Sequence, residues 1–127
     1  MTASDMPLAL VTGAARGIGR AITARLLADG YRLLAVDRDA EALRETCAAL
    51  AHLGVIEGEV ADIGSQPDIE VLAEHVCERT DRLDVLVNNA AISIRRPLEE
   101  LLPEEWQRVL AVNLSGPFLL VRALAPL

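Results

Sequence analysis

The chain has 127 residues, of which 52% are hydrophobic, and its 19 acidic and 12 basic residues give a formal net charge of −7. This acidic balance, without a basic stripe, excludes nucleic acid and an anionic membrane as expected main partners. No apolar run approaches the roughly 20 residues of a membrane span, so we expect one globular domain over residues 1–127.

Residues 1–7 lack the basic-then-apolar layout of a signal peptide. Residues 8–11 form a short apolar run typical of a buried central strand. Glycines at 13, 17 and 19 follow, and then a helical pattern to about residue 29. Such a turn presents the unpaired N–H groups and the positive dipole end of the helix, and glycines let an anion approach them. The pattern predicts a pyrophosphate cradle in a βαβ unit, with an unliganded strand-to-helix turn as the alternative.

Further strands are expected at residues 32–37, 55–60 and 83–88, with Asp39 and Ser65 capping the helices between them. Short connections between four strands and alternating helices imply a parallel sheet covered by helices, the α/β class. Cys47 and Cys77 fall on predicted helices without C-x-x-C spacing. We therefore expect free thiols in a reducing cytoplasm.

Asp37 ends the second predicted strand, eighteen residues after Gly19. An acid near this spacing binds the ribose hydroxyls of a bound dinucleotide. Its carboxylate would repel a 2′-phosphate, so NAD is favoured over NADP. Arg16 and Arg38 favour the opposite choice, because either guanidinium could bind that phosphate. The alternative is that Asp37 only caps a turn before Asp39.

The run Asn88-Asn89-Ala90-Ala91 lies where the fourth predicted strand ends, beside the glycine turn. In a doubly wound sheet this is the switch point, where ligands bind. The amide side chains of Asn88 and Asn89 can satisfy backbone groups that lose their ladder partners at a strand end.

A last helix is expected from about residue 103 to the end of the chain, and Asn113 would lie on its apolar face. The face consists of Trp106, Val109, Leu110, Asn113, Pro117 and Leu120. A buried amide needs partners, which could be a neighbouring carbonyl or a functional group. His52 and His75 have no acid, Cys or His at metal-ligand spacing, so no metal site is predicted.

These motifs resemble those of the classical short-chain dehydrogenase/reductase family. Four motifs show the resemblance: Thr12-Gly-x-x-x-Gly17-x-Gly19, Asp62 after the third strand, Asn-Asn-Ala, and Asn113-x-x-Gly116-x-Phe118. Ala91 departs from the family pattern, in which a glycine follows Asn-Asn-Ala. The resemblance implies a Rossmann-like doubly wound sheet of strand order 3-2-1-4, incomplete relative to the seven-stranded family sheet.

The resemblance also implies roles for individual residues in binding a nicotinamide dinucleotide. The implied cofactor-binding residues are Thr12, Gly13, Arg16, Gly17, Ile18, Gly19, Asp37, Arg38, Asp62, Ile63, Asn89, Ala90 and Ala91. Asp62 and Ile63 would contact the adenine ring, and Asn89 and Ala90 would lie along the nicotinamide side. Asn113 would order a water in the proton relay of the parent enzyme.

The resemblance covers only the N-terminal half of the family pattern. The catalytic Tyr-x-x-x-Lys and Ser cannot be placed, because Tyr31 precedes a strand and all twelve basic residues are arginines. We expect a fragment of an NAD(P)-dependent oxidoreductase acting on an alcohol or ketone, inactive by itself. The alternatives are a non-catalytic dinucleotide-binding module, or a half-protein that needs a C-terminal partner in trans. The apolar fourth strand at the sheet edge predicts a homo-oligomer or poor solubility.

Overall fold

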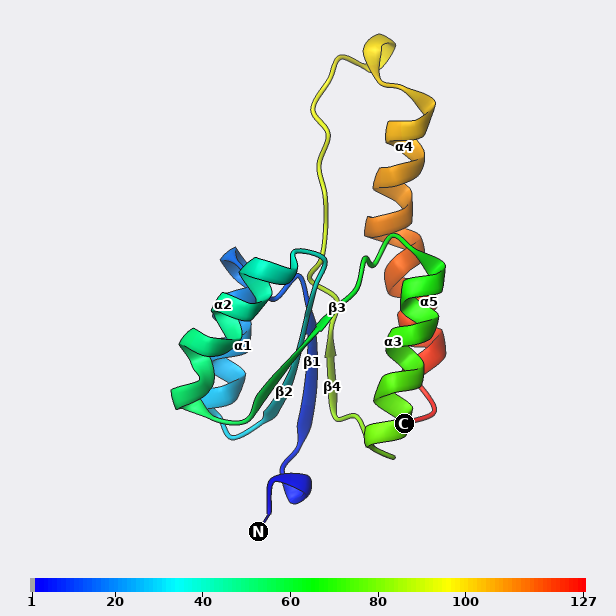
Figure 1. Ribbon diagram of the computed structural model, residues 1–127. Coiled ribbons are helices and arrows are strands. Elements are labelled where there is room, and N and C mark those ends of the chain that lie inside the picture. The colour runs from blue at the N-terminus through cyan, green and yellow to red at the C-terminus, as the bar shows by residue number, and fades with distance from the viewer. Residues whose placement is uncertain (1) are drawn as a thin grey trace.

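The computed structural model describes residues 2–127, which contain one four-stranded parallel sheet. Its strands are β1 (Leu8–Thr12), β2 (Arg32–Asp37), β3 (Ile56–Val60) and β4 (Val85–Val87). They lie in the order β3-β2-β1-β4, and every adjacent pair is parallel (Figure 1). The expected order 3-2-1-4 is therefore confirmed, with a fourth strand shorter than predicted.

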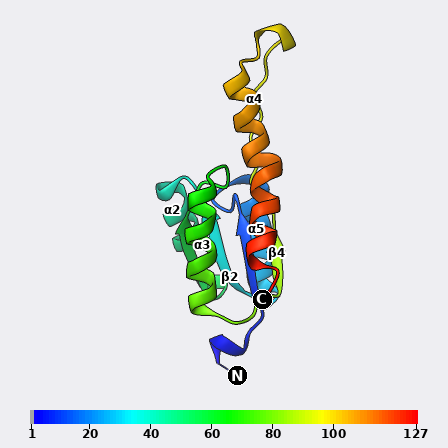
Figure 2. The same ribbon diagram turned by 90° about the vertical axis from the view of Figure 1, so that its right-hand side faces the viewer.

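Helices cover both faces of the sheet, as a doubly wound fold requires. α1 (Gly17–Ala28) and α2 (Ala40–Leu50) lie on one face, and α3 (Gln66–Arg79) and α5 (Gly116–Leu124) lie on the other (Figure 1). α4 (Pro103–Leu110) continues the line of α5 beyond the sheet, as the turned view in Figure 2 also shows. The short helical turns are η1 (Ala3–Asp5), η2 (Ala51–Leu53), η3 (Leu98–Glu100) and the π-helical turn η4 (Ala111–Ser115).

Two apolar clusters, one on each face, form the core. Successive side chains of a strand point to opposite faces, so Ala9 and Val11 of β1 pack with α1 and α2. Leu10, between them, packs with α3 and α5, and all three residues are fully buried. Because both faces are covered, the central strand is uniformly apolar, which is why residues 8–11 could be identified from the sequence.

The expected helix boundaries are set by the residues that the sequence indicated. The Asp39 carboxylate accepts the Ala42 amide at 3.1 Å, and Ser65 Oγ accepts the Asp68 amide at 3.3 Å. Each side chain thereby satisfies one of the free N–H groups of a first helical turn. Gly30, with a φ of 95°, follows α1.

The last helix differs from the prediction in the face that it buries. Val112, Gly116, Leu120 and Leu124 face the core, whereas Trp106 is 53% exposed and Asn113 is also exposed. The expected apolar face is therefore wrong for Trp106 and Asn113, whereas Leu120 is buried and three other members are half-buried: Val109, Leu110 and Pro117. A π turn accommodates more residues than an α turn, so a stripe counted from α4 does not continue into α5.

No helix among residues 2–127 combines the length and the apolarity needed to cross a membrane.

Candidate functional site

The glycine turn between β1 and α1 requires glycine for two reasons, a left-handed backbone at two positions and a close backbone approach at a third. Gly13 and Gly17 have φ values of 63° and 56°, a region that favours glycine. Gly19 instead makes room, because a Cβ there would lie 1.9 Å from the Gly13 carbonyl oxygen. The first N–H groups of α1 have no intrahelical acceptor, and the exposed Gly17 and Ile18 lie at this end. The helix therefore begins with a local excess of positive charge that suits an anion.

Thr12 and Asn89 hold the end of β1 against the segment that follows β4. Thr12 Oγ1, in a residue only 1% exposed, accepts the amides of Asn89 and Ala90 at 3.1 and 3.0 Å. The Asn89 side-chain amide donates to the Thr12 and Gly13 carbonyls, both at 3.2 Å. The expectation that an amide satisfies strand-end backbone groups is confirmed for Asn89, whereas Asn88 is exposed.

Ala91 takes the place of the family glycine without left-handed backbone strain. Among residues 2–127, every residue with a positive φ is a glycine. The alanine methyl group is accordingly compatible with the backbone at this position.

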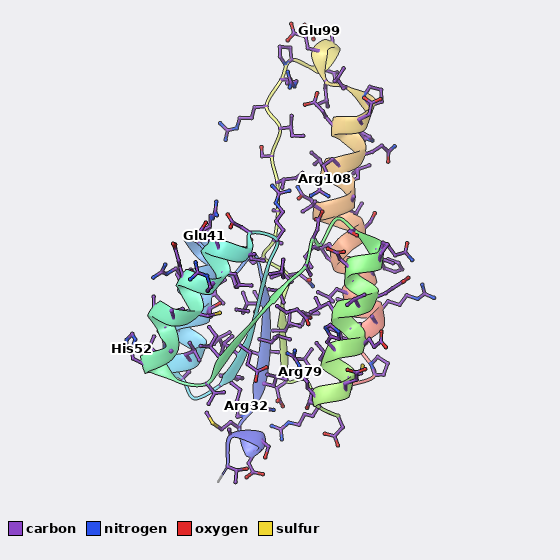
Figure 3. All side chains as sticks on the ribbon, in the orientation of Figure 1. Arg32, Glu41, His52, Arg79, Glu99 and Arg108 are labelled. Carbon is purple, nitrogen blue, oxygen red and sulfur yellow. The ribbon has the colours of Figure 1, made fainter. Side chains whose placement is uncertain are left out.

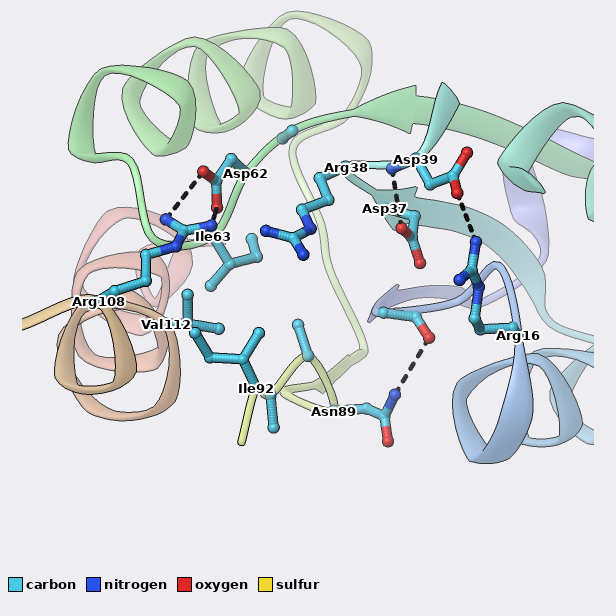
Figure 4. A pocket seen from close by; sticks show the side chains of 14 residues that line it. Arg16, Asp37, Arg38, Asp39, Asp62, Ile63, Asn89, Ile92, Arg108 and Val112 are labelled. Carbon is cyan, nitrogen blue, oxygen red and sulfur yellow. Dashed lines mark hydrogen bonds and ion pairs between the residues drawn. The ribbon is translucent and has the colours of Figure 1, made fainter. Parts of the chain in front are cut away.

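Asp37, at the end of β2, joins the glycine turn to the next loop. Its carboxylate accepts the Ala15 amide at 3.1 Å and the Asp39 amide at 3.0 Å. The turn-capping role considered for Asp37 is thus present, and the same carboxylate also lines a pocket. Arg16 pairs with Asp39, and the Arg38 side chain extends into the pocket (Figure 4).

Asp62, which follows β3, is held by an arginine from a distant helix. Arg108 of α4 contacts both carboxylate oxygens at 3.0 Å, and the Gly64 amide donates to Oδ1 at 2.9 Å. Burial raises the pKa of Asp62, but the Arg108 and Gly64 hydrogen bonds and the charges of Arg108 and Arg38 lower it below its ordinary value. Asp62 is therefore ionised at neutral pH.

These elements surround one pocket of about 380 Å³ at the carboxyl ends of the strands (Figure 4). Figure 3 places Arg108 beside this end of the sheet, and Arg32 and Arg79 near the other. The expected site residues that line the pocket are Gly13, Arg16, Asp37, Arg38, Asp62, Ile63, Asn89, Ala90 and Ala91. The remaining expected residues are outside its lining: Thr12, Gly17, Ile18, Gly19 and Asn113. Sequence reasoning did not identify Arg108, Val112 and Ile92, which also line it.

Asn113 fastens the π turn to the segment after β4. Its Oδ1 accepts the Ile92 amide and its Nδ2 donates to the Ile92 carbonyl, both at 2.9 Å. A bond to a neighbouring carbonyl was one of the two roles considered for Asn113; its carbonyl partner is instead Ile92, which lies 21 residues earlier in the chain. The amide satisfies both backbone groups of one residue next to the pocket wall.

The two histidines make protein contacts and gather no metal-binding cluster. His75 pairs with Glu59 across α3 and β3, and His52 Nδ1 lies 2.9 Å from the Ala49 carbonyl oxygen. Among residues 2–127, no group of three or more His, Cys, Asp or Glu side chains is placed to hold a metal ion.

Three features together define a Rossmann-like dinucleotide-binding domain. A glycine turn opens the first helix, an acid stands at or just after the end of each of the next two strands, and a pocket lies at the switch point of the sheet. Residues 7–127 match the short chain dehydrogenase family. The chain belongs to this family.

Curated relatives of the chain are oxidoreductases of several kinds. D-threitol dehydrogenase of Mycolicibacterium smegmatis is 39% identical over 120 residues, which are 94% of this chain and 46% of the relative. A putative ketoacyl reductase of Streptomyces coelicolor is 42% identical over 119 residues, 93% of this chain and 46% of the relative. The chain spans about half the length of the curated relatives it matches.

Solved structures share the fold closely. A metagenomic short-chain oxidoreductase in complex with NADP superposes with a TM-score of 0.90 at 40% identity, covering 94% of this chain and 55% of the other. RhlG of Pseudomonas aeruginosa in complex with NADP also has a TM-score of 0.90, at 38% identity, covering 95% and 47%. Relatives of the chain therefore bind a nicotinamide dinucleotide.

Proposed function

We propose that this chain is the cofactor-binding part of an oxidoreductase that transfers hydride between a nicotinamide dinucleotide and an alcohol or ketone. The observation that carries the proposal is the pocket itself. It joins the glycine turn, Asp37, Asp62 and Asn89 from four strand ends that lie far apart in the sequence. Membership of the family and the NADP complexes of its relatives support the same proposal.

The residues present suit each part of such a cofactor. The first turn of α1 offers unpaired N–H groups to the pyrophosphate, and Gly17 leaves open space there, since a Cβ would meet nothing within 4 Å. Asp37 would accept the adenosine ribose hydroxyls, and Asp62 with Ile63 would hold the adenine. Asn89 and Ala90 would lie along the nicotinamide side. When bound, the nicotinamide supplies the hydride acceptor or donor.

We propose NAD as the preferred cofactor, on the charge of Asp37. A carboxylate at this position repels a 2′-phosphate and suits free ribose hydroxyls. Arg16, which could oppose this preference, is already paired with Asp39, whereas Arg38 extends into the pocket. The two solved relatives described above are NADP complexes, so they do not support the preference for NAD.

We further propose that the chain alone binds the cofactor without turning over substrate. Tyr31 lies just before β2, at the opposite end of the sheet from the pocket, and the sequence has no lysine that could assist it in proton transfer. A complete enzyme would draw its proton donor from another segment, in cis or in trans. The alternative is a module that binds a dinucleotide and has no redox activity of its own.

Calorimetric titration of the folded chain with NAD and NADP tests the proposal, with Asp37→Ser as the matched variant. We expect saturable binding of NAD and weaker binding of NADP, and we expect Asp37→Ser to narrow or reverse that order. If neither nicotinamide dinucleotide binds, the proposed function is wrong. If NADP binds more tightly to the unaltered chain, only the preference for NAD is wrong.

We also propose that the isolated chain self-associates. β4 forms one edge of the sheet, and its three apolar residues are only partly buried. An unpaired apolar edge is a template for another strand. Light scattering is expected to detect oligomers that grow with concentration, and a monomer at high concentration would contradict this proposal.

A further inference from the structure

The contacts of Asp62 leave it with little capacity for a ligand. Arg108 reaches both of its oxygens, and the Gly64 amide takes a second position on Oδ1. A carboxylate offers about four acceptor positions, two on each oxygen. Three of them are occupied by these contacts, so one position on Oδ2 is left in a residue that lines the pocket.

Gly64 permits this arrangement. A Cβ on Gly64 would lie 2.3 Å from Arg108 Nη1, 3.1 Å from Arg108 Cζ and 2.8 Å from a Val112 methyl group. The guanidinium therefore rests directly on the backbone of the loop that carries Asp62. A side chain at position 64 would displace the tip of Arg108 without touching the chemistry of either charged residue.

We propose that Arg108 is a positioning residue that sets the base selectivity of the pocket, by fixing Asp62 so that its one remaining acceptor position receives an exocyclic amino group. The inference rests on the proposed function, because it assigns the adenine end of the dinucleotide to Asp62. An arginine suits this task because its planar fork holds both carboxylate oxygens at once, which a lysine cannot do.

The selectivity follows from donor and acceptor chemistry. The 6-amino group of adenine donates a hydrogen bond to the free position on Asp62. A 6-oxo base presents a lone pair to the same carboxylate and is repelled. If Asp62 could rotate freely, it could turn away from a 6-oxo base, and the loop and solvent would reduce the difference in binding free energy between the two bases. A fixed, ionised Asp62 therefore discriminates between the two bases more strongly than a mobile one.

The test compares NAD with nicotinamide hypoxanthine dinucleotide, which differs only in the 6-oxo base, by calorimetry on the full 127-residue chain. We expect the unaltered chain to bind NAD about tenfold more tightly, the scale of one hydrogen bond to a charged group. Arg108→Met should reduce the ratio to less than about threefold, and Arg108→Lys should give an intermediate ratio. Arg122→Met is the control, since Arg122 is exposed on α5 and makes no ion pair among residues 2–127.

Gly64→Ala provides an independent test that keeps both charged residues. It should lower the ratio as Arg108→Met does, because the new methyl group displaces the guanidinium. Circular dichroism checks that each variant is folded, and Gly64→Ala decides the outcome if Arg108→Met is not. An unchanged ratio in the folded variants would overturn the inference alone. Failure of the unaltered chain to bind either dinucleotide would overturn it together with the proposed function.

Discussion

Replacing Asn89 by aspartate tests whether its amide holds the glycine turn to the end of β4. The change is nearly isosteric, but it replaces the Nδ2 donor with an oxygen 3.2 Å from the Thr12 and Gly13 carbonyls. Two net hydrogen bonds of about 1 kcal/mol each are lost. Placing a partly buried charge against two carbonyl oxygens adds about 1–3 kcal/mol. We therefore expect Asn89→Asp to destabilise the chain by about 3–5 kcal/mol, a large share of a typical domain's stability.

The measurement is urea unfolding followed by far-ultraviolet circular dichroism at pH 7, with Asn88→Asp as the matched control. The neighbouring Asn88 is exposed and makes no side-chain hydrogen bond among residues 2–127. The same change in net charge at position 88 should therefore shift the free energy of unfolding by less than about 0.5 kcal/mol. Equal stability of the two variants would refute the assigned role of Asn89.

The pH dependence gives a second check on Asn89→Asp. A protonated carboxyl can again donate one hydrogen bond, so the folded state should raise the pKa of the new aspartate above its unfolded value. The part of the penalty that comes from ionisation, measured relative to Asn88→Asp, is then fully present above the folded pKa, and it is lost as the pH falls from the folded pKa to the unfolded pKa near 3.9. A difference between the variants that does not change with pH would exclude carbonyl repulsion as its cause.

Three further changes probe the site. Thr12→Val removes the acceptor of two backbone amides and should cost about 2–4 kcal/mol in urea unfolding, whereas Thr12→Ser should retain most of the stability. Gly19→Ala would place a methyl carbon 1.9 Å from the Gly13 carbonyl oxygen, so it should abolish cooperative unfolding or dinucleotide binding. Arg108→Met removes one hydrogen bond and one charge that lower the pKa of Asp62, and leaves only the Gly64 amide and Arg38 to oppose burial. The pKa of Asp62 should therefore rise, and NAD binding should weaken at a higher pH than in the unaltered chain as the pH falls.

Each of these three predictions could be contradicted by a specific result. Equal stability of the valine and serine variants at position 12 would show that the hydroxyl does not hold the turn. Gly54→Ala is the control for Gly19→Ala, because the atoms nearest to its Cβ would belong to Leu27, the closest of them a methyl carbon at 3.3 Å. Equal effects of these two alanine variants would contradict the proposed close packing. Identical pH profiles with and without Arg108 would remove its assigned influence on Asp62.

The sheet could be predicted from the sequence because each strand and each helix cap is indicated by residues close together in the chain. A strand buried on both faces must be uniformly apolar, and residues 8–11 and 33–36 satisfy this over their own length. Asp39 and Ser65 were identifiable as caps because a cap bonds an amide only three residues ahead. The residues at the strand ends could then be brought to one edge by topology alone, since parallel strands end on the same side.

Arg108 could not be found in this way, because nothing near it in the sequence indicates its partner. It pairs with an acid 46 residues earlier, and exposed arginines are common on helices. The only sequence trace of the contact is Gly64, whose missing side chain makes room for the guanidinium. Glycines are common in loops for their backbone freedom alone, so the pairing becomes identifiable only when the two elements are seen together.

The last helix depends both on local sequence patterns and on contacts between residues far apart in the chain. Asn113 could be identified as a polar residue in an apolar stretch, but it was assigned to the wrong face of the helix. Its two bonds to Ile92 lie across the π turn, and Arg108, five residues earlier, bonds Asp62 on another wall of the pocket. One helix thereby fixes both the loop after β3 and the segment after β4. An uninterrupted α-helix would turn these two side chains by a different angle, since a π turn changes the number of residues per turn. Apolar periodicity carries no signal for a π turn, so the relative direction of these two side chains could not be derived from the sequence.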